Sequence, residues 1–320
     1  MPASITKSAV PEEMISRMVS NAFGEDALEI EELKEGYFNV AYRIGLKDRN
    51  VVLKIAPPGN VDTMTSEKNI MFSEVDSIKM AAEKTEVPVP EILFYDSGRT
   101  ILDREYFFME MLEGQSLSSL EGKLSEREKQ SVYFDAGKYT RMLNEITGKG
   151  FGYYSRPDKQ GESWYQVFRS ILMDVYYDAG RKAVLIPVER ERLLLLLERD
   201  EKIFEAVKIP RFVHWDIWDG NIFVKDGKIE GIIDFERCLW GDVLMEVGFR
   251  TYGYRKAFFD GYGMKGLSPE EERRAKWYDI YLFLTWCIEG EYRKYEDDGL
   301  YRHGCEMLKK WVKELEGAAG

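Results

Sequence analysis

Three polar residues within positions 212–236 have the types and the spacing that phosphoryl transfer needs. Asp216 and Asn221 stand five positions apart, and Asp234 follows thirteen residues later at the end of an apolar stretch. The reaction requires a carboxylate that orients the attacking hydroxyl and accepts its proton, and two oxygen ligands for Mg²⁺. We therefore interpret Asp216 as the catalytic base and Asn221 and Asp234 as the magnesium ligands.

The first part of the chain is rich in predicted strands. Residues 37–46 and 50–55 favour β-structure on either side of a turn-like stretch, which predicts an antiparallel hairpin. Helical spacing covers residues 66–84 and ends before two prolines. Two more strands are predicted at residues 92–95 and 105–112. One helix therefore lies inside an otherwise strand-rich unit.

The rest of the chain is largely helical in its pattern. Serine caps at Ser125 and Ser268 mark two helix starts. The helices predicted in this part begin at 125, cover 164–183, 188–207 and 268–295, and resume at 301. Residues 221–234 interrupt them with two strands around a tight turn. We expect a small nucleotide-binding lobe of residues 1–112 and a larger catalytic and substrate-binding lobe of residues 113–320, with ligands in the cleft between them.

The charge and the cysteines restrict the class of protein. The chain has 57 acidic and 45 basic residues, a net charge of −12, so we expect no nucleic-acid partner. Three cysteines without a CxxC pair indicate reduced thiols and no disulfide framework. The sequence has no membrane-length apolar stretch and no signal-peptide pattern. We therefore expect a soluble, cytoplasmic protein without a membrane partner.

The segment His-Trp-Asp-Ile-Trp-Asp-Gly-Asn, which ends at Asn221, is followed downstream by Ile-Ile-Asp-Phe-Glu. This arrangement resembles the HGDxxxxN…IDF(D/E) pattern of the aminoglycoside phosphotransferase and choline kinase-like superfamily, which is related to the protein kinases. The resemblance extends across nearly the whole chain. It implies an α+β, protein kinase-like fold of two lobes, with ATP or GTP and Mg²⁺ as cofactors.

The resemblance also assigns nucleotide-binding residues in the strand-rich part. Gly36 and Asn39 match a Gly-x-x-Asn phosphate loop, and Lys54 matches the strand lysine that bridges the α- and β-phosphates. The family pattern implies that Glu74 holds this lysine in place. Glu67, two turns earlier on the same predicted helix, is the alternative.

Further roles follow from the same resemblance. The strand at the end of the first lobe resembles a hinge, in which the backbone carbonyl of Glu110 and the amide of Leu112 would bond the adenine edge. Asp242 matches a family position that implies hydrogen-bond support of the catalytic loop. The resemblance implies that His214 also holds this loop by hydrogen bonds and is not a general base.

Three positions depart from the family pattern. Trp215 stands where the antibiotic kinases usually have glycine, Val243 replaces a proline, and Glu246 replaces an aspartate. We do not expect these changes to abolish activity. Val243 and Glu246 move the chain away from the characterised resistance enzymes.

Residues that line the acceptor pocket are harder to derive from spacing. Acidic side chains near the motif or on a late helix would suit a cationic acceptor, and the candidates are Asp219, Glu236, Glu289 and Glu291. Trp218 and Trp240 would add cation–π contacts. Acids that form a solvated helix face and tryptophans that belong to the core are the alternative for each of these residues.

The sequence therefore predicts a kinase that moves the γ-phosphate to a hydroxyl of a small acceptor such as an aminoglycoside. A choline, sugar or fructosamine-type kinase differs only in its acceptor and remains an alternative. A nucleotide-binding pseudokinase that serves as an interaction module is a second alternative, although Lys54 and the three motif residues are intact. A phosphohydrolase with Asp216 as nucleophile would leave the first lobe without a role.

Overall fold

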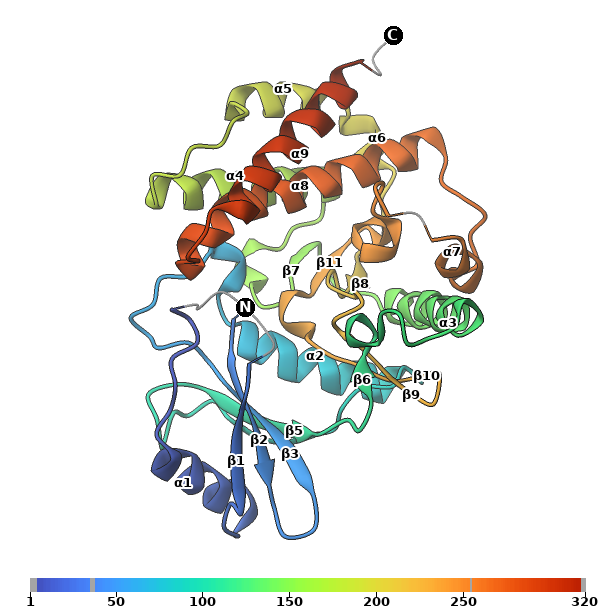
Figure 1. Ribbon diagram of the computed structural model, residues 1–320. Helices are drawn as coiled ribbons and strands as arrows, with labels where there is room; N and C mark the ends of the chain where they lie inside the picture. The colour runs from blue at the N-terminus through green and yellow to red at the C-terminus, as the bar shows by residue number, and fades with distance from the viewer. Residues whose placement is uncertain (1–4, 35–37, 254, 318–320) are drawn as a thin grey trace.

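The computed structural model describes residues 5–34, 38–253 and 255–317 (Figure 1). The N-terminal part forms a five-stranded antiparallel sheet in the order β1-β2-β3-β5-β4. Its strands are β1 Glu29–Leu33, β2 Val40–Gly45, β3 Asn50–Ile55, β4 Ile92–Asp96 and β5 Tyr106–Glu110. The predicted hairpin is confirmed, because β2 pairs with β3 from Val40–Ile55 to Gly45–Asn50.

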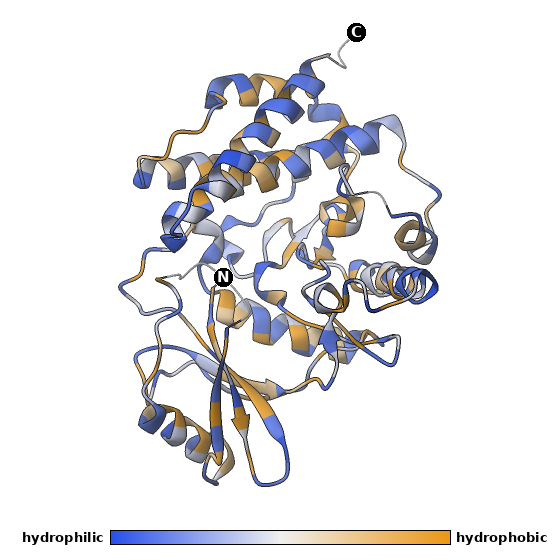
Figure 2. Ribbon diagram, viewed as in Figure 1, coloured by the Kyte–Doolittle hydropathy of each residue, from blue (hydrophilic) through white to orange (hydrophobic). Residues whose placement is uncertain are grey.

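Helices cover both faces of this sheet. Helix α1 (Glu12–Phe23) packs on one face, where Leu53 of β3 joins its cluster. Helix α2 (Ile70–Lys84) packs on the other face, against Val52. Successive strand residues point to opposite faces, so Lys54 shares the α2 side with Val52. Figure 2 shows the apolar residues (orange) along these strands.

Helices dominate the C-terminal part. They are α3 Glu126–Asn144, α4 Trp164–Arg181, α5 Arg190–Arg199, α6 Glu201–Glu205, α7 Lys256–Tyr262, α8 Pro269–Arg293 and α9 Gly299–Gly317. Helix α8 lies at the centre of this group, and its aromatic and aliphatic side chains enter the largest core cluster. The predicted serine caps are present, because the hydroxyls of Ser125 and Ser268 accept hydrogen bonds from Glu128 N and Glu271 N.

Two small sheets interrupt the helices. One has the order β10-β9-β6 and the other β7-β11-β8. Their strands are β6 Gln115–Ser116, β7 Gly152–Tyr153, β8 Arg211–Val213, β9 Ile222–Lys225, β10 Lys228–Ile232 and β11 Leu239–Gly241. Strands β9 and β10 form the predicted hairpin. Together with β8 they bring the catalytic motif to the middle of the molecule.

The α+β arrangement with a strand-rich first part is therefore confirmed, while several boundaries differ from the prediction. The helix predicted over residues 188–207 is broken at Asp200, whose carboxylate bonds Arg273 and Trp277 of α8. The acidic edge strand β1 and the short α7 were not predicted. The boundary between residues 112 and 113 stays a prediction. Within the described residues, every helix is too short or too polar to span a bilayer.

Candidate active site

Lys54 makes two ion pairs from the α2-facing side of β3. Its Nζ is 2.5 Å from Oε1 of Glu74 and 3.1 Å from Oδ1 of Asp234. Burial alone would lower the pKa of Lys54, but the carboxylates of Asp234 and Glu74 raise it above its ordinary value. The lysine is therefore held protonated between the large sheet and the residues that follow β10.

Glu74, and not Glu67, pairs with this lysine. Glu74 is fully buried on α2. Glu67 lies in a short 3₁₀ turn before the helix and is separated from it by Asn69, which has a left-handed backbone with φ of 58°. Glu67 bonds Arg293 of α8 instead, with Nη1 of the arginine 3.3 Å from Oε2 of the glutamate. The backbone break at Asn69 thus separates the two glutamates.

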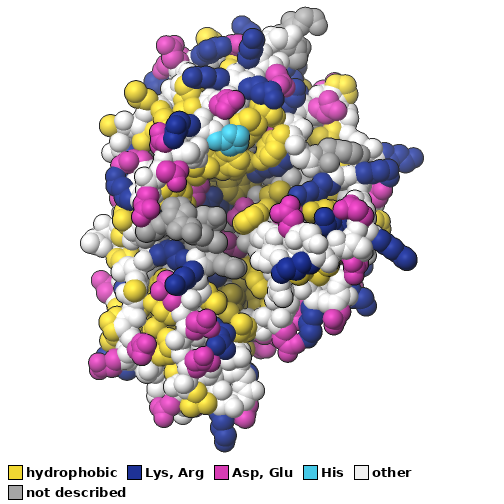
Figure 3. Space-filling model, in the orientation of Figure 1, with side chains coloured by type: hydrophobic (Ala, Val, Ile, Leu, Met, Phe, Trp, Pro, Cys, Tyr) yellow, Lys and Arg dark blue, Asp and Glu magenta, His cyan; other side chains and the backbone are white. Residues whose placement is uncertain are grey.

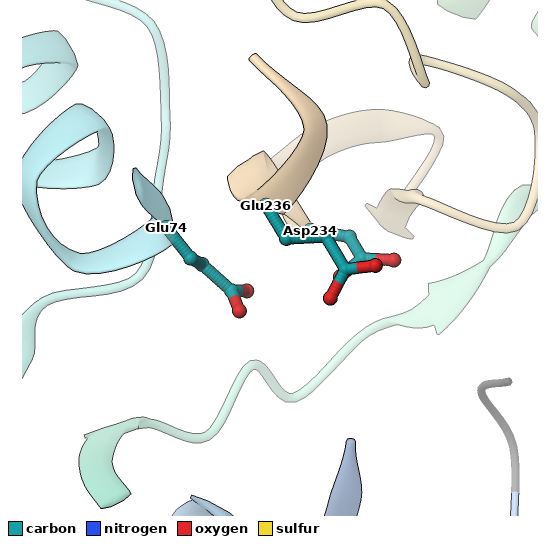
Figure 4. A group of neighbouring side chains, drawn as sticks. All are labelled: Glu74, Asp234 and Glu236. Atoms are coloured by element: carbon teal, nitrogen blue, oxygen red, sulfur yellow. The ribbon is translucent and has the colours of Figure 1, made fainter. Parts of the chain in front are cut away.

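Glu236 completes a group of three carboxylates with Glu74 and Asp234 (Figure 4). One oxygen atom from each lies within 4.8 Å of the others. The ammonium of Lys54 is the cation of this group, because it bonds two of the three. Oε2 of Glu236 accepts a hydrogen bond of 3.1 Å from the side chain of Asn39. Glu236 therefore faces the predicted phosphate-loop residue Asn39, and its role toward an acceptor stays a prediction.

The loop between β8 and β9 brings Asp216 and Asn221 together. Nδ2 of Asn221 donates to the backbone carbonyl of Asp216 at 2.9 Å and to its Oδ2 at 3.3 Å. The backbone carbonyl of Asn221 accepts from the amide of Ile233 at 3.0 Å. That bond continues the β9–β10 ladder and places Asp234 next to the loop. The three residues predicted from their spacing thus belong to one site.

Burial and nearby charges both act on the carboxylate of Asp216. Burial raises the pKa of Asp216 to about 7, while the guanidinium groups of Arg237 and Arg250 oppose this rise. A group with a pKa near neutrality exchanges a proton readily at physiological pH. Arg237 was not identified as a site residue from the sequence. Its position directly after the Asp-Phe-Glu stretch was the one signal that could have indicated it.

His214 is buried beneath the loop. Its Nε2 lies 3.2 Å from the carbonyl of Ile233 and donates to it, while Nδ1 accepts from the amide of Asp216 at 3.2 Å. Burial lowers the pKa of His214 to about 4, so the ring is neutral at physiological pH. A neutral ring bonded on both sides connects the loop to the end of β10.

Glu246, and not Asp242, bonds the backbone of the catalytic loop. Oε1 and Oε2 of Glu246 accept from the amides of His214 and Trp215 at 2.9 and 3.0 Å. The carboxylate of Asp242 accepts from Arg274 at 2.8 Å and from Tyr278 at 2.7 Å, both on α8. The expected contact of Asp242 with the loop is therefore corrected. The longer side chain that replaces the usual aspartate at position 246 makes this contact.

Trp215 adopts a backbone conformation that glycine tolerates best. Its φ is 72°, in the left-handed region, which accounts for the glycine of the related pattern at this position. The indole is buried and packs against Tyr281, with ring centroids 5.5 Å apart. The guanidinium carbons of Arg237 and Arg250 lie 5.5 and 5.7 Å from its ring centroid. The indole is therefore held by ring packing and by two cation–π contacts.

Asp219 does not present an open carboxylate. Arg255 bonds both of its oxygens, at 2.8 and 3.2 Å, and the hydroxyl of Tyr133 donates to Oδ2 at 3.0 Å. The carboxylate thus fixes α3 and the segment before α7 to the catalytic loop. Trp240 follows the alternative of a packed tryptophan, because its ring stacks on Tyr154 with centroids 5.5 Å apart.

The two acids on α8 have different surroundings. Glu289 is buried, and its Oε1 lies 3.3 Å from Arg237 and 3.9 Å from Arg293. Glu291 is more exposed and pairs with Lys294 near the end of the helix. Glu289 acts electrostatically on Asp216, since it is one of the groups that raise the pKa of that residue.

The oxygen donors beside Asp216 fit a hard divalent cation. Asn221 bonds Asp216 through its amide nitrogen, so its side-chain oxygen points elsewhere and is not used in that bond. Asp234 bonds Lys54 through Oδ1, and 30% of its side chain is exposed. Carboxylate and amide oxygens of this kind suit Mg²⁺.

The remaining nucleotide predictions concern loop and hinge positions. Gly36 lies outside the described residues. Glu110 ends β5, and its amide donates to Glu91 at 2.9 Å. Leu112 packs over Gly231, where an added Cβ would approach the leucine side chain to 2.6 Å. Adenine binding by Glu110 and Leu112 stays a prediction.

Two relatives resemble the chain in sequence. A protein named "Probable ketoamine kinase" from Enterococcus faecium is 26% identical over 265 residues, which are 78% of this chain and 85% of that protein. Altered inheritance of mitochondria protein 9 from Clavispora lusitaniae is 29% identical over 137 residues, or 40% of this chain. The chain spans only 22% of that second protein.

Solved structures show the same fold. A protein described as a fructosamine-3-kinase from Haemophilus somnus superposes with a TM-score of 0.69 at 17% identity, over 94% of this chain and 97% of that one. The ternary complex of APH(2")-IIa with streptomycin and ATP gives a TM-score of 0.63 at 18% identity, over 97% of each chain. The model of the Phosphotransferase enzyme family matches residues 29–278. This match covers well over half of the chain, which therefore belongs to the phosphotransferase enzyme family.

Proposed function

We propose that this protein transfers the γ-phosphate of ATP to a hydroxyl of a ketoamine, a sugar that carries an amine substituent. The family supports the reaction type. The relative named as a ketoamine kinase supports the acceptor class. The observation that carries the proposal is the internal pairing of the acidic side chains around Asp216.

The residues of the chain would divide the reaction among them. Asp216 would orient the acceptor hydroxyl and take its proton, for which a pKa near neutrality is suited. Lys54, held by Glu74, would bind the phosphates of the nucleotide. Asn221 and Asp234 would hold Mg²⁺, which neutralises charge on the β- and γ-phosphates when bound. Most of the rate enhancement would come from positioning and charge stabilisation.

The paired acids favour an acceptor of low positive charge. A polycationic aminoglycoside needs several open carboxylates, because each ammonium group that loses water must gain a partner. Asp219 is already bonded by Arg255, and Glu289 by Arg237. A ketoamine carries one amine beside its sugar ring, so it requires fewer free acids.

An aromatic platform beside the base also suits a sugar. Trp218, two residues after Asp216, is 41% exposed. Gly220 leaves room for its indole, since an added Cβ would lie 2.3 Å from the ring. The apolar face of a sugar ring packs on such an indole, and an adjacent amine gains a cation–π contact.

An aminoglycoside is the second candidate acceptor. The net charge of −12 draws cations toward the protein and favours it. The two acceptors differ in how many unpaired carboxylates they need in the pocket. This local requirement decides between them.

A phosphate-transfer assay with a panel of acceptors tests the proposal. The panel contains Nε-fructosyl-lysine, 1-deoxy-1-morpholino-fructose, kanamycin and choline, each with ATP or GTP and Mg²⁺. We expect phosphorylation of the two ketoamines, and a loss of kcat by about 10²–10⁴-fold in Asp216→Asn, because the amide cannot accept the proton. Turnover of kanamycin or choline without turnover of a ketoamine contradicts the proposed acceptor.

The matched control is Asp226→Asn. Asp226 is an exposed aspartate in the turn between β9 and β10, outside the site. The Asp226→Asn variant should retain the wild-type kcat, and Asp216→Asn and Asp226→Asn should both keep the wild-type Tm. A similar loss in both variants would attribute the effect to the fold rather than to Asp216.

A further inference from the structure

Five aromatic rings form a continuous band over α8, α9 and the segment before α7. The ring of His303 stacks on Trp286 with centroids 5.6 Å apart, and Trp286 contacts Phe283 at 5.4 Å. Phe283 then meets Tyr252 at 5.7 Å and Trp311 at 5.3 Å. Tyr252 is 46% exposed, His303 is exposed and Trp286 is partly buried. Figure 3 shows hydrophobic side chains (yellow) gathered around a histidine (cyan) and continuing into a hollow.

The segment that carries Tyr252 is fixed to both sides of the catalytic base. Arg250 lies over the ring of Trp215, which precedes the base, at 5.7 Å. Arg255 makes the bidentate pair with Asp219, which follows the base by three residues. Tyr252 lies between these two anchors, so its position is fixed relative to the catalytic loop.

Helix α8 connects the band to the same loop from the other side. Trp286 and Glu289 are three residues apart and therefore lie on one face of the helix. Glu289 bonds Arg237, whose guanidinium is the first of the charges that lower the pKa of Asp216. The aromatic band thus begins one helical turn from the groups around the base.

We propose that the aromatic band (Tyr252, Phe283, Trp286, His303 and Trp311) binds the end of the acceptor that is not phosphorylated, and that this end is an aromatic or apolar group. The inference rests on the proposed function, because it assigns the substituent of the ketoamine to the band while its sugar lies at Asp216. The rings of Tyr252, Trp286 and His303 reach the surface over the buried Phe283 and Trp311, and contiguous rings of this kind offer offset stacking and apolar contact to a flat group. Tyr252 and Trp286 would then determine which substituent is preferred.

A pair of acceptors with the same fructosyl group tests this assignment. Nε-fructosyl-lysine has no ring on its lysine, and Nα-hippuryl-Nε-fructosyl-lysine adds an aromatic acyl group. We expect wild-type kcat/KM to be about tenfold higher for the hippuryl acceptor, the effect of one stacked ring. In Tyr252→Ala and Trp286→Ala the ratio between the two acceptors should fall toward one, while Tyr252→Phe should keep it.

The control variant is Tyr177→Ala on α4. Tyr177 is 65% exposed and does not belong to the aromatic band, so the wild-type ratio should remain. A wild-type ratio near one overturns the assignment. An unchanged ratio in both alanine variants also overturns it and leaves the band a packing role only.

Calorimetry with hippuryl-lysine, which lacks the sugar, separates this inference from the proposed function. We expect wild type to bind this fragment at least tenfold more tightly than Tyr252→Ala or Trp286→Ala does. Binding of the fragment without turnover of either ketoamine would overturn the ketoamine proposal and retain the aromatic site. Turnover of both ketoamines without binding of the fragment would retain the proposed function and overturn the aromatic site.

Discussion

The side of the site that we propose for the nucleotide and the side that we propose for the acceptor arrange their charges in opposite ways. On the nucleotide side, one cation, Lys54, lies between Asp234, which motif spacing identified, and Glu74, which the family resemblance implied. On the acceptor side, the acids Asp219 and Glu289 are paired with the arginines 255 and 237. An acid near a catalytic motif therefore contributes open charge only if no basic side chain already bonds it.

The two sides also differ in burial. Lys54 and Glu74 are both buried, so neither charge can be hydrated if its partner is removed. Arg255 and Asp219 have side chains that are 40% and 25% exposed. Partly hydrated pairs contribute little to stability. Substitutions at Lys54 or Glu74 should therefore affect the fold, while substitutions at Arg255 or Asp219 should mainly change specificity.

Lys54→Met should have the largest effect. It leaves the buried carboxylate of Glu74 without its cation, so the free energy of unfolding should fall by about 3–5 kcal/mol. Loss of the phosphate-binding charge should reduce kcat/KM by about 10²–10³-fold. Chemical denaturation and the transfer assay measure the two effects.

The double variant Lys54→Met/Glu74→Gln separates stability from activity. It removes both charges, so most of the lost stability should return while activity stays low. Recovery of activity would show that the lysine acts only through the fold. A stability loss equal to that of the single variant would contradict the explanation by an unpaired carboxylate.

His214 should make the free energy of unfolding depend on pH. Burial lowers its pKa from about 6.5 to about 4, with Asp234 opposing and Lys54 supporting the change. As pH falls below 6.5, the unfolded chain takes up a proton that the folded ring does not bind until pH is near 4. Stability from this residue is complete above pH 6.5 and declines by about 3 kcal/mol on acidification to pH 4.

The pH effect is measured as the difference between wild type and His214→Asn. Asparagine can accept the hydrogen bond from the amide of Asp216 but does not titrate. The free energy of unfolding of wild type should therefore fall more steeply between pH 6.5 and 4 than that of the variant. Parallel curves of unfolding free energy against pH for wild type and His214→Asn would refute the pH dependence assigned to His214.

What could be predicted from the sequence also differs between the two sides of the site. Asp216, Asn221 and Asp234 lie within nineteen residues and were found from spacing, because one loop and one hairpin bring them together. Lys54 followed from family resemblance, and the register of β3 explains why it faces Glu74.

The acceptor side depends on contacts that local patterns do not contain. Arg255 meets Asp219 from 36 positions away, and Arg237 meets Glu289 from 52. Glu246, and not Asp242, bonds the catalytic loop, because the side chains of these two residues after β11 point in different directions. Residue types alone do not specify these directions. The fold was therefore more predictable than the charge of the pocket.

Arg255→Ala should have the smallest effect on stability and the most specific effect on the acceptor. It frees the carboxylate of Asp219, and unfolding should change by no more than about 1 kcal/mol. The added open charge should raise kcat/KM for kanamycin relative to fructosyl-lysine by about two- to fivefold, the effect of one exposed ion pair.

Lys256→Ala is the matched control, because it changes the net charge equally one residue further along. Lys256 pairs with Asp260 on the exposed side of α7, so its loss leaves Asp219 bonded to Arg255. Only Arg255→Ala should shift the preference toward kanamycin. An equal shift in both variants would show that overall charge selects the acceptor, and the contrast between the two sides of the site would then concern stability alone.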